Sequence, residues 1–222
     1  VADSDLTLGT MTLSPKSLQS STSYSRQLLA SISMDVEQMV REDMASAHAL
    51  AIDLGALHGK GGDGEPTGIY IAQDVNIKAF GGVPTFGKMV DMATEAAIDN
   101  ALLGTLAYLT TPEMAGLLMQ TEVTATTGQF IWKGRHDEGV VAGYRSISSN
   151  QAFKTLGAGA EHAITFANWR DLIIGNWGGV EVVVDPFSKK KQALIEVTTF
   201  EMADILLRHG ESFVKATGAT LV

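Results

Sequence analysis

The fold is decided by residues 25–68, which read SRQLLASISMDVEQMVREDMASAHALAIDLGALHGKGGDGEPTG. Apolar residues recur here three or four positions apart, and this spacing places them on one stripe of a helix. Ser33 or Asp35 can cap a fresh helix start and divide the pattern into a short and a long helix. The stripe that we predict to be buried consists of Leu29, Ile32, Val36, Met39, Val40, Ala47, Leu50, Ala51, Leu54 and Leu57.

The composition is that of a folded globular chain. Its 222 residues are 45% hydrophobic and 18% charged, which allows one large domain or two small ones. The lack of cysteine excludes disulfides and thiolate zinc sites. A formal charge of −9 disfavours a surface that grips nucleic acid. No apolar run is long enough to predict a membrane span or a signal peptide, so we expect no membrane partner.

The N-terminal part predicts a strand without an obvious partner. Residues from Leu6 to Leu13 alternate loosely, and the pattern stops at Ser14-Pro15. Such a strand must pair with an upstream segment, a distant strand or another chain, unless it is a frayed terminus. The serine-rich stretch from Ser17 to Ser25 is interpreted as a connector into the helix.

After residue 68, helical and strand patterns are mixed without regular alternation, which predicts an α+β chain. Thr85 and Thr111 are suited to cap two helices, and Pro112 suits the first helical position. The inner face of the first of these helices is predicted to hold Phe86, Met89, Val90, Ala93, Ala97 and Ala101. The predicted strands cover 69–77, 106–109, 130–132, 140–147, 163–166, 172–174, 180–184, 192–200, 204–207 and 212–216.

The glycine run from Gly59 to Gly64 matches the dinucleotide-binding pattern G-x-G-x-x-G. That pattern works where a strand enters the turn and a helix leaves it, aiming amide donors at a phosphate. Here a helix enters and a strand is predicted to leave, so the negative helix end faces the loop. We therefore interpret the run as a structural hinge, with a soluble nucleotide-binding enzyme as an alternative. The hinge residues are Gly59, Gly61, Gly64, Pro66 and Gly68.

No residue pattern predicts a catalytic, metal or cofactor site. His48 and His58 are ten positions apart on the helix, about 15 Å along its axis, and cannot share a metal. His136 lies in a loop beside two carboxylates, which is weak evidence for ligation. The histidines are therefore expected to be solvated. No G-x-S-x-G motif is present to suggest a hydrolase.

Short motifs follow one another along the chain in an order that resembles a known family, and their order and spacing matter more than any single motif. These motifs are Ser25-Arg26-Gln27-Leu28-Leu29, Ala49 to Leu57, Gly59 to Gly64, Glu65-Pro66-Thr67-Gly68-Ile69, Leu109-Thr110-Thr111-Pro112, Gly143-Tyr144-Arg145-Ser146-Ile147, Asn168-Trp169-Arg170 to Gly175, and Arg208-His209-Gly210-Glu211-Ser212-Phe213. Over nearly its whole length the chain resembles the tailed-bacteriophage major capsid protein family, with the Hong Kong 97 type of capsid fold.

This resemblance implies a subunit of two parts. A peripheral domain would comprise residues 25–61 and 189–222, with the long helix as its spine. An axial mixed α/β domain would comprise residues 62–188 and gather around the five-fold and six-fold axes. Residues 1–24 would be the remnant of an extended loop and a connector, with Leu6 to Pro15 lying over a neighbouring subunit. The candidate subunit-contact residues are Leu6, Leu8, Met11, Leu13, Lys16, Arg26, Glu37 and Arg41.

The function implied is structural and not enzymatic. The chain would be a major capsid subunit that assembles into pentamers and hexamers of an icosahedral shell, enclosing phage or prophage DNA without binding it specifically. Scaffold, protease, portal or decoration proteins are possible partners. The protein would belong to the virion and assemble in the bacterial host cytoplasm. An encapsulin-like compartment shell is the alternative within the same fold, although Glu65-Pro66-Thr67-Gly68 is more similar to phage sequences.

Overall fold

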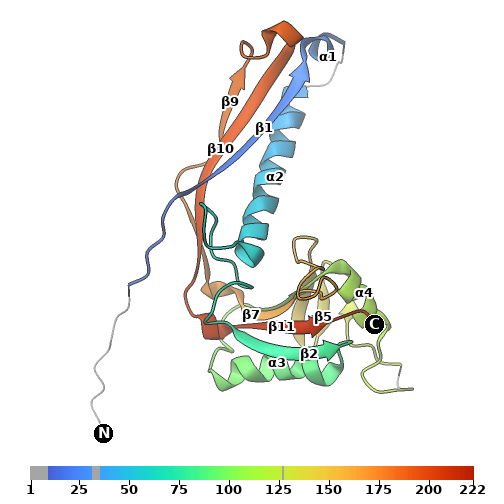
Figure 1. The fold of residues 1–222 in the computed structure, drawn as a ribbon. Coiled ribbons are helices and arrows are strands. Elements are labelled where there is room, and N and C mark those ends of the chain that lie inside the picture. Colours follow the sequence, from blue (N-terminus) through green and yellow to red (C-terminus); the bar gives the residue numbers. More distant parts are fainter. Residues whose placement is uncertain (1–9, 32–35, 127) are drawn as a thin grey trace.

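The computed structural model describes residues 10–31, 36–126 and 128–222. Figure 1 shows an elongated arm standing on a rounder lobe, with the long helix α2 running beside the strands of the arm. The helices are α1 (Arg26–Ser31), α2 (Val36–His58), α3 (Phe86–Ile98) and α4 (Pro112–Gln120). The strands of the arm are β1 (Lys16–Ser25), β8 (Leu172–Asn176), β9 (Glu181–Asp185) and β10 (Leu194–Leu207). Helices and strands of both parts together confirm the α+β class.

The arm is built around β10, the longest strand of the described chain. All ten residues of β1 pair antiparallel with β10 on one side, while β8 and β9 pair with successive parts of its other side. Alternate residues of β10, among them Val197, Thr199 and Ile205, are buried. Because alternate residues of a strand share one face, this pattern shows that one face of the arm sheet is covered, and α2 contacts it.

The connector expected from Ser17 to Ser25 is in fact strand β1. Serine is not among the residues enriched in strands, so the sequence did not reveal a strand that is held by backbone pairing with β10. The strand predicted from Leu6 to Leu13 is not confirmed. Residues 10–13 are not in a strand, and its first part lies outside the described residues.

The division of the helical pattern into a short and a long helix is confirmed by α1 and α2. The predicted buried stripe is wrong for its middle part, because Met39, Leu50 and Leu54 are 47%, 50% and 37% exposed. The face that contacts the arm sheet instead carries Met44 and His48. The apolar spacing therefore located a face that a single chain does not bury.

The lobe contains a seven-stranded sheet in the order β2, β11, β7, β3, β6, β5, β4. Its strands are β2 (Asn76–Gly82), β3 (Leu106–Thr110), β4 (Lys133–Gly134), β5 (Gly139–Val141), β6 (Tyr144–Ser148), β7 (Ile164–Asn168) and β11 (Phe213–Ala219). Three short 3-10 turns lie at Trp169–Asp171, Lys190–Gln192 and Gly210–Ser212. Residues 69–75 form turns, so the strand predicted from Ile69 begins only at Asn76.

The strand β11 corrects one expectation about the two parts. Residues 213–219 were grouped with the long helix, but β11 pairs with β2 and β7 inside the sheet of the lobe. The neighbouring β10 lies in the sheet of the arm together with β8 and β9, which the expected axial range 62–188 had included. The chain therefore passes from arm to lobe between Leu207 and Phe213.

Both predicted helix caps of the lobe are confirmed. The side chain of Thr85 accepts a hydrogen bond from the amide of Lys88, and that of Thr111 accepts one from Met114. The buried face of α3 consists of Met89, Met92, Ala93 and Ala96. Of the residues predicted for that face, Ala97 is exposed and Phe86 and Val90 are only half-buried.

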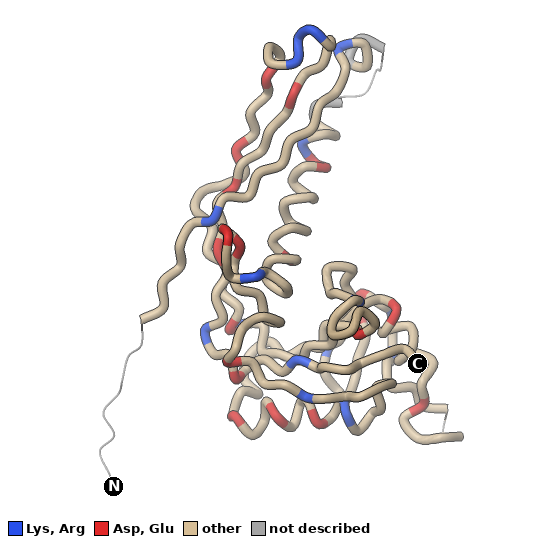
Figure 2. Tube along the Cα trace, viewed as in Figure 1, with Lys and Arg blue, Asp and Glu red and all other residues tan. Residues whose placement is uncertain are grey.

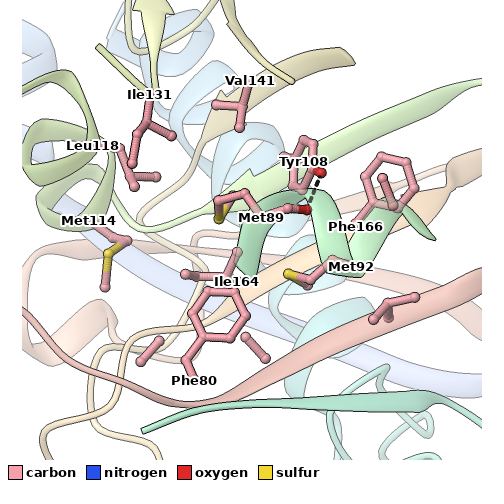
Figure 3. Packing of buried hydrophobic residues seen from close by; sticks show 14 of the residues in the cluster. Phe80, Met89, Met92, Tyr108, Met114, Leu118, Ile131, Val141, Ile164 and Phe166 are labelled. Carbon is pink, nitrogen blue, oxygen red and sulfur yellow. Dashed lines mark hydrogen bonds between the residues drawn. The ribbon is translucent and has the colours of Figure 1, made fainter. Parts of the chain in front are cut away.

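The main core lies between the sheet of the lobe and its two helices. Figure 3 shows Met89 and Met92 of α3 in one cluster with Phe166 of β7, and Leu118 of α4 beside Ile131. The hydroxyl of Tyr108 donates to the carbonyl oxygen of Met89 over 2.6 Å, which satisfies the buried phenol. Burial of each such large side chain contributes about 1.5–3 kcal/mol, so this cluster fixes the position of α3 on the sheet.

Candidate assembly surfaces

The described residues hold no group of three or more His, Asp or Glu side chains placed to bind a metal ion. Within the same ranges, no helix combines the length and the hydropathy needed to cross a membrane.

A buried polar network fastens α2 to the arm sheet. The Nδ1 atom of His48 lies 3.1 Å from a carboxylate oxygen of Glu201, and its Nε2 atom lies 2.7 Å from the hydroxyl of Thr199. The other carboxylate oxygen of Glu201 accepts from the side chain of Asn176 over 2.9 Å. His48 was expected to be solvated, but it is 2% exposed. Buried polar groups need partners, and this network supplies them only when α2 is in register with β10.

The end of α2 is held by a second histidine. The ring of His58 stacks between Phe153 and Tyr70, with centroid distances of 3.7 and 4.7 Å. Its Nε2 atom accepts a hydrogen bond from the amide of Phe153 over 2.9 Å. Burial lowers the pKa of His58 to about 4, so the ring is neutral near pH 7 and can accept this bond. The contact joins the arm to the lobe.

The glycine run folds back on the end of α2. The amide of Gly61 donates to Pro66, and the amide of Gly68 donates to Gly59. The amides of Ile69 and Tyr70 then donate to carbonyl oxygens in the last turn of α2, at 2.9 Å each. Because these amides are used within the chain, they cannot cradle a phosphate. The loop thus gives no support to the nucleotide-binding alternative.

The residues before β1 are tied to the arm by Asp204. Its buried carboxylate accepts from the amide of Ser14 at 2.9 Å and lies 3.1 Å from the Nζ atom of Lys16. Burial alone would raise the pKa of Asp204, but these donors and the amide of Ile205 hold it below its ordinary value. The ionised carboxylate therefore sets the direction in which the N-terminal segment leaves the arm.

Of the candidate contact residues that the structure describes, Lys16 and Arg26 already contact their own chain. Lys16 pairs with Asp204, and Arg26 donates to the carbonyl oxygen of Pro186. Met11 is 58% exposed, and Leu13 is half-buried. Arg41 is half-buried on α2. Leu6, Leu8 and the side chain of Glu37 lie outside the described residues. Whether any of these residues contacts a neighbouring subunit stays a prediction.

Large apolar side chains are exposed on both faces of the arm. Met39 and Leu50 are exposed on α2, and Leu54 is exposed where α2 borders the sheet. On the other face of the sheet, Phe200 and Met202 of β10 are 40% and 46% exposed. Contiguous exposed apolar patches mark interaction sites. Sequence reasoning missed Phe200 and Met202, although they alternate with Thr199, Glu201 and Ala203 and thus reveal the second face of a strand.

An apolar groove of about 380 Å³ separates α2 from β1 and β10. Leu54 on its edge continues the exposed flank of α2, and Ile205 lies among the β10 residues that line it. His58 and Pro66 line its end at the glycine run. The groove therefore lies where the helix, the arm sheet and the loop meet.

The comparison with known families gives a match over almost the whole chain. Residues 1–218 match the family described as the phage capsid family. The chain belongs to the phage capsid family. Among curated proteins, it is 30% identical over 210 residues to the major capsid protein of Halomonas phage phiHAP-1. That match covers 95% of this chain and 33% of the relative, so the chain spans about one third of the relative's length.

Solved structures with the same fold include a GTA particle capsid, a phage protein and an encapsulin. A capsid of a native GTA particle aligns with a TM-score of 0.68 and 17% identity, covering 93% of this chain and 73% of that one. The Microbacterium phage Oxtober96 structure gives 0.70 at 10% identity, covering 91% and 72%. The SrpI encapsulin of Synechococcus elongatus gives 0.67 at 11% identity, covering 94% and 75%. At these identities the likeness establishes the phage capsid fold alone.

Proposed function

We propose that this protein is a non-enzymatic major capsid subunit that assembles into a closed icosahedral shell. The observation that supports it best is the arm, whose helix and sheet expose apolar side chains on both outer faces. Exposed apolar side chains do not stabilise a single chain, whereas neighbouring copies of the chain can bury them. Membership of the phage capsid family also supports a capsid function.

Assembly would depend on many contacts between subunits, each of which buries only a small area. In a symmetric shell each contact is repeated around closed rings, so the whole can be stable although every interface is small. We propose pentamers and hexamers as the repeating units. In this arrangement the arm, formed by α2 with β1, β8, β9 and β10, is the peripheral part, and the lobe that includes β11 is the axial part.

The shell would enclose DNA without gripping it. The chain carries a formal charge of −9, which repels phosphate groups on average. We propose that the protein resides in the virion and assembles in the bacterial cytoplasm. Scaffold, protease, portal or decoration proteins would act at its surfaces during or after assembly.

The test of this function is assembly of the complete gene product, followed by electron microscopy. Closed shells are expected from the unchanged protein. Leu50→Asp together with Leu54→Asp should abolish them, because both changes put charge on the exposed flank of α2. Ala49→Asp is the matched control, since Ala49 is exposed on another flank of the same helix. Discrete small oligomers from the unchanged protein would contradict the proposal.

The encapsulin-like compartment is a second candidate, favoured by the fold shared with the Synechococcus encapsulin. The contents of purified shells distinguish the two. Nuclease-protected DNA supports the virion, whereas a packaged protein in place of DNA supports the compartment.

A further inference from the structure

Helix α3 is apolar around more of its circumference than the lobe buries. Its core face is covered, but Phe86, Val90 and Ala97 form a second flank that is half-buried or exposed. Ile98 at the end of the helix is 68% exposed. A helix that is apolar on two flanks is normally buried on both. The second flank therefore requires a cover that the described lobe does not supply.

A groove runs along this second flank, and its far wall comes from the turn between β5 and β6. Its volume is about 370 Å³, and Ala142 and Tyr144 lie opposite Val90. Asp91 is exposed on α3 next to this flank. Within the described ranges, Asp91 forms no ion pair. This side of the lobe thus combines an apolar groove with a carboxylate beside it, and Figure 2 shows further acidic residues along α3.

The opposite face of the lobe sheet carries basic side chains around an apolar one, which complement Asp91 and the apolar groove. Val140 of β5 pairs with Lys133 of β4 and with Arg145 of β6, so these three side chains share one face. Their chain neighbours Val141 and Tyr144 lie against the core under α3, which places the three on the other side. All three are exposed, Val140 by 44%. We call them the basic row.

We propose that the second flank of α3 in one copy docks against the basic row of a second copy of this chain. The apolar flank would cover Val140, while Asp91 would approach Lys133 or Arg145, a complementary pairing of charge. The two surfaces lie on opposite faces of one sheet, so the contact is head-to-tail. A head-to-tail contact generates rings when its rotation closes. This inference rests on the proposed capsid function and names the surfaces that meet around each axis.

Cysteine crosslinking tests the contact against a clean background, because the chain has no cysteine. Copies carrying Ala97→Cys are mixed with copies carrying Val140→Cys, assembled, and oxidised. The mixture should give crosslinked dimers and neither variant alone should give any. The double variant should give a ladder that ends at the ring size. Ala49→Cys combined with Val140→Cys is the control, since Ala49 is exposed on the arm, and should give no ladder.

Electron microscopy of the same samples distinguishes failure of the proposed contact from failure of the proposed capsid function. Shells without crosslinks would overturn this contact and leave the capsid function standing. Crosslinked dimers from Ala97→Cys alone would overturn it as well, because they indicate a face-to-face contact. Failure to assemble, with no crosslinks, would contradict both.

A charge exchange provides a second, independent measurement. Asp91→Lys or Lys133→Glu alone should weaken association roughly two- to fivefold per contact, the range for an exposed ion pair. The double exchange should restore assembly, because the pair is rebuilt with reversed signs. Equal loss in the single and double variants would overturn the pairing.

Discussion

At the scale of single residues, the contact between His48 and Glu201 determines how α2 lies on the arm sheet. Both side chains are buried, at 2% and 7% exposure, and Glu201 also accepts from Asn176. Glu201→Ala should destabilise the chain by about 3 kcal/mol, because His48 and Asn176 lose a buried partner. Chemical denaturation followed by circular dichroism measures this. Glu196→Ala, which removes a partly exposed ion pair with Lys189, should cost less than about 1 kcal/mol, and a loss equal to that of Glu201→Ala would contradict the argument.

The second prediction at this scale concerns the stability of the fold at acidic pH. Because burial lowers the pKa of His58 to about 4 in the folded state, its contribution to stability is complete above its ordinary pKa of 6.5. This contribution is lost as the pH falls from 6.5 towards 4, since the unfolded chain takes up the proton first. The loss should be on the order of 2 kcal/mol. His58→Phe keeps the stacking but cannot titrate, so its unfolding free energy should fall less over this range. If the unfolding free energies of the unchanged protein and the His58→Phe variant fall equally with pH, His58 does not cause the loss of stability in acid.

At the scale of elements, the segment from Gly59 to Gly68 packs as a tight corner at the end of α2. A side chain at Gly68 would lie 2.5 Å from the amide nitrogen of Gly59, and one at Gly59 would overlap the carbonyl oxygen of Pro66. Gly68→Ala should therefore cost about 1–3 kcal/mol, measured by thermal unfolding. Gly62→Ala is the matched control, since nothing lies within 4 Å of the added carbon. A similar loss in both variants would contradict a packed corner.

The elements also show what the sequence could reveal. The caps at Thr85 and Thr111 were predictable because a cap depends on a few adjacent residues. Strand β1 was not, because its pairing with β10 joins residues far apart in the chain. On α2 and α3 the apolar spacing predicted the helices correctly but misplaced part of each buried face. It cannot tell a face covered within the chain from one such as Leu50, which is 50% exposed.

At the scale of the whole molecule, the net charge of −9 argues against a surface that grips nucleic acid. The basic stretch Lys189 to Lys191 lies at the tip of the arm, and Lys189 is already paired with Glu196 at 2.9 Å. The chain has 25 acidic against 16 basic residues, which disfavours counterion displacement, and affinity for a duplex comes mainly from that displacement. Fluorescence anisotropy with a labelled duplex should therefore show no saturation at micromolar protein, at either low or moderate salt. Lys190→Glu with Lys191→Glu should leave the signal unchanged. Submicromolar binding that weakens steeply with salt and disappears in this double variant would show that the tip of the arm grips nucleic acid.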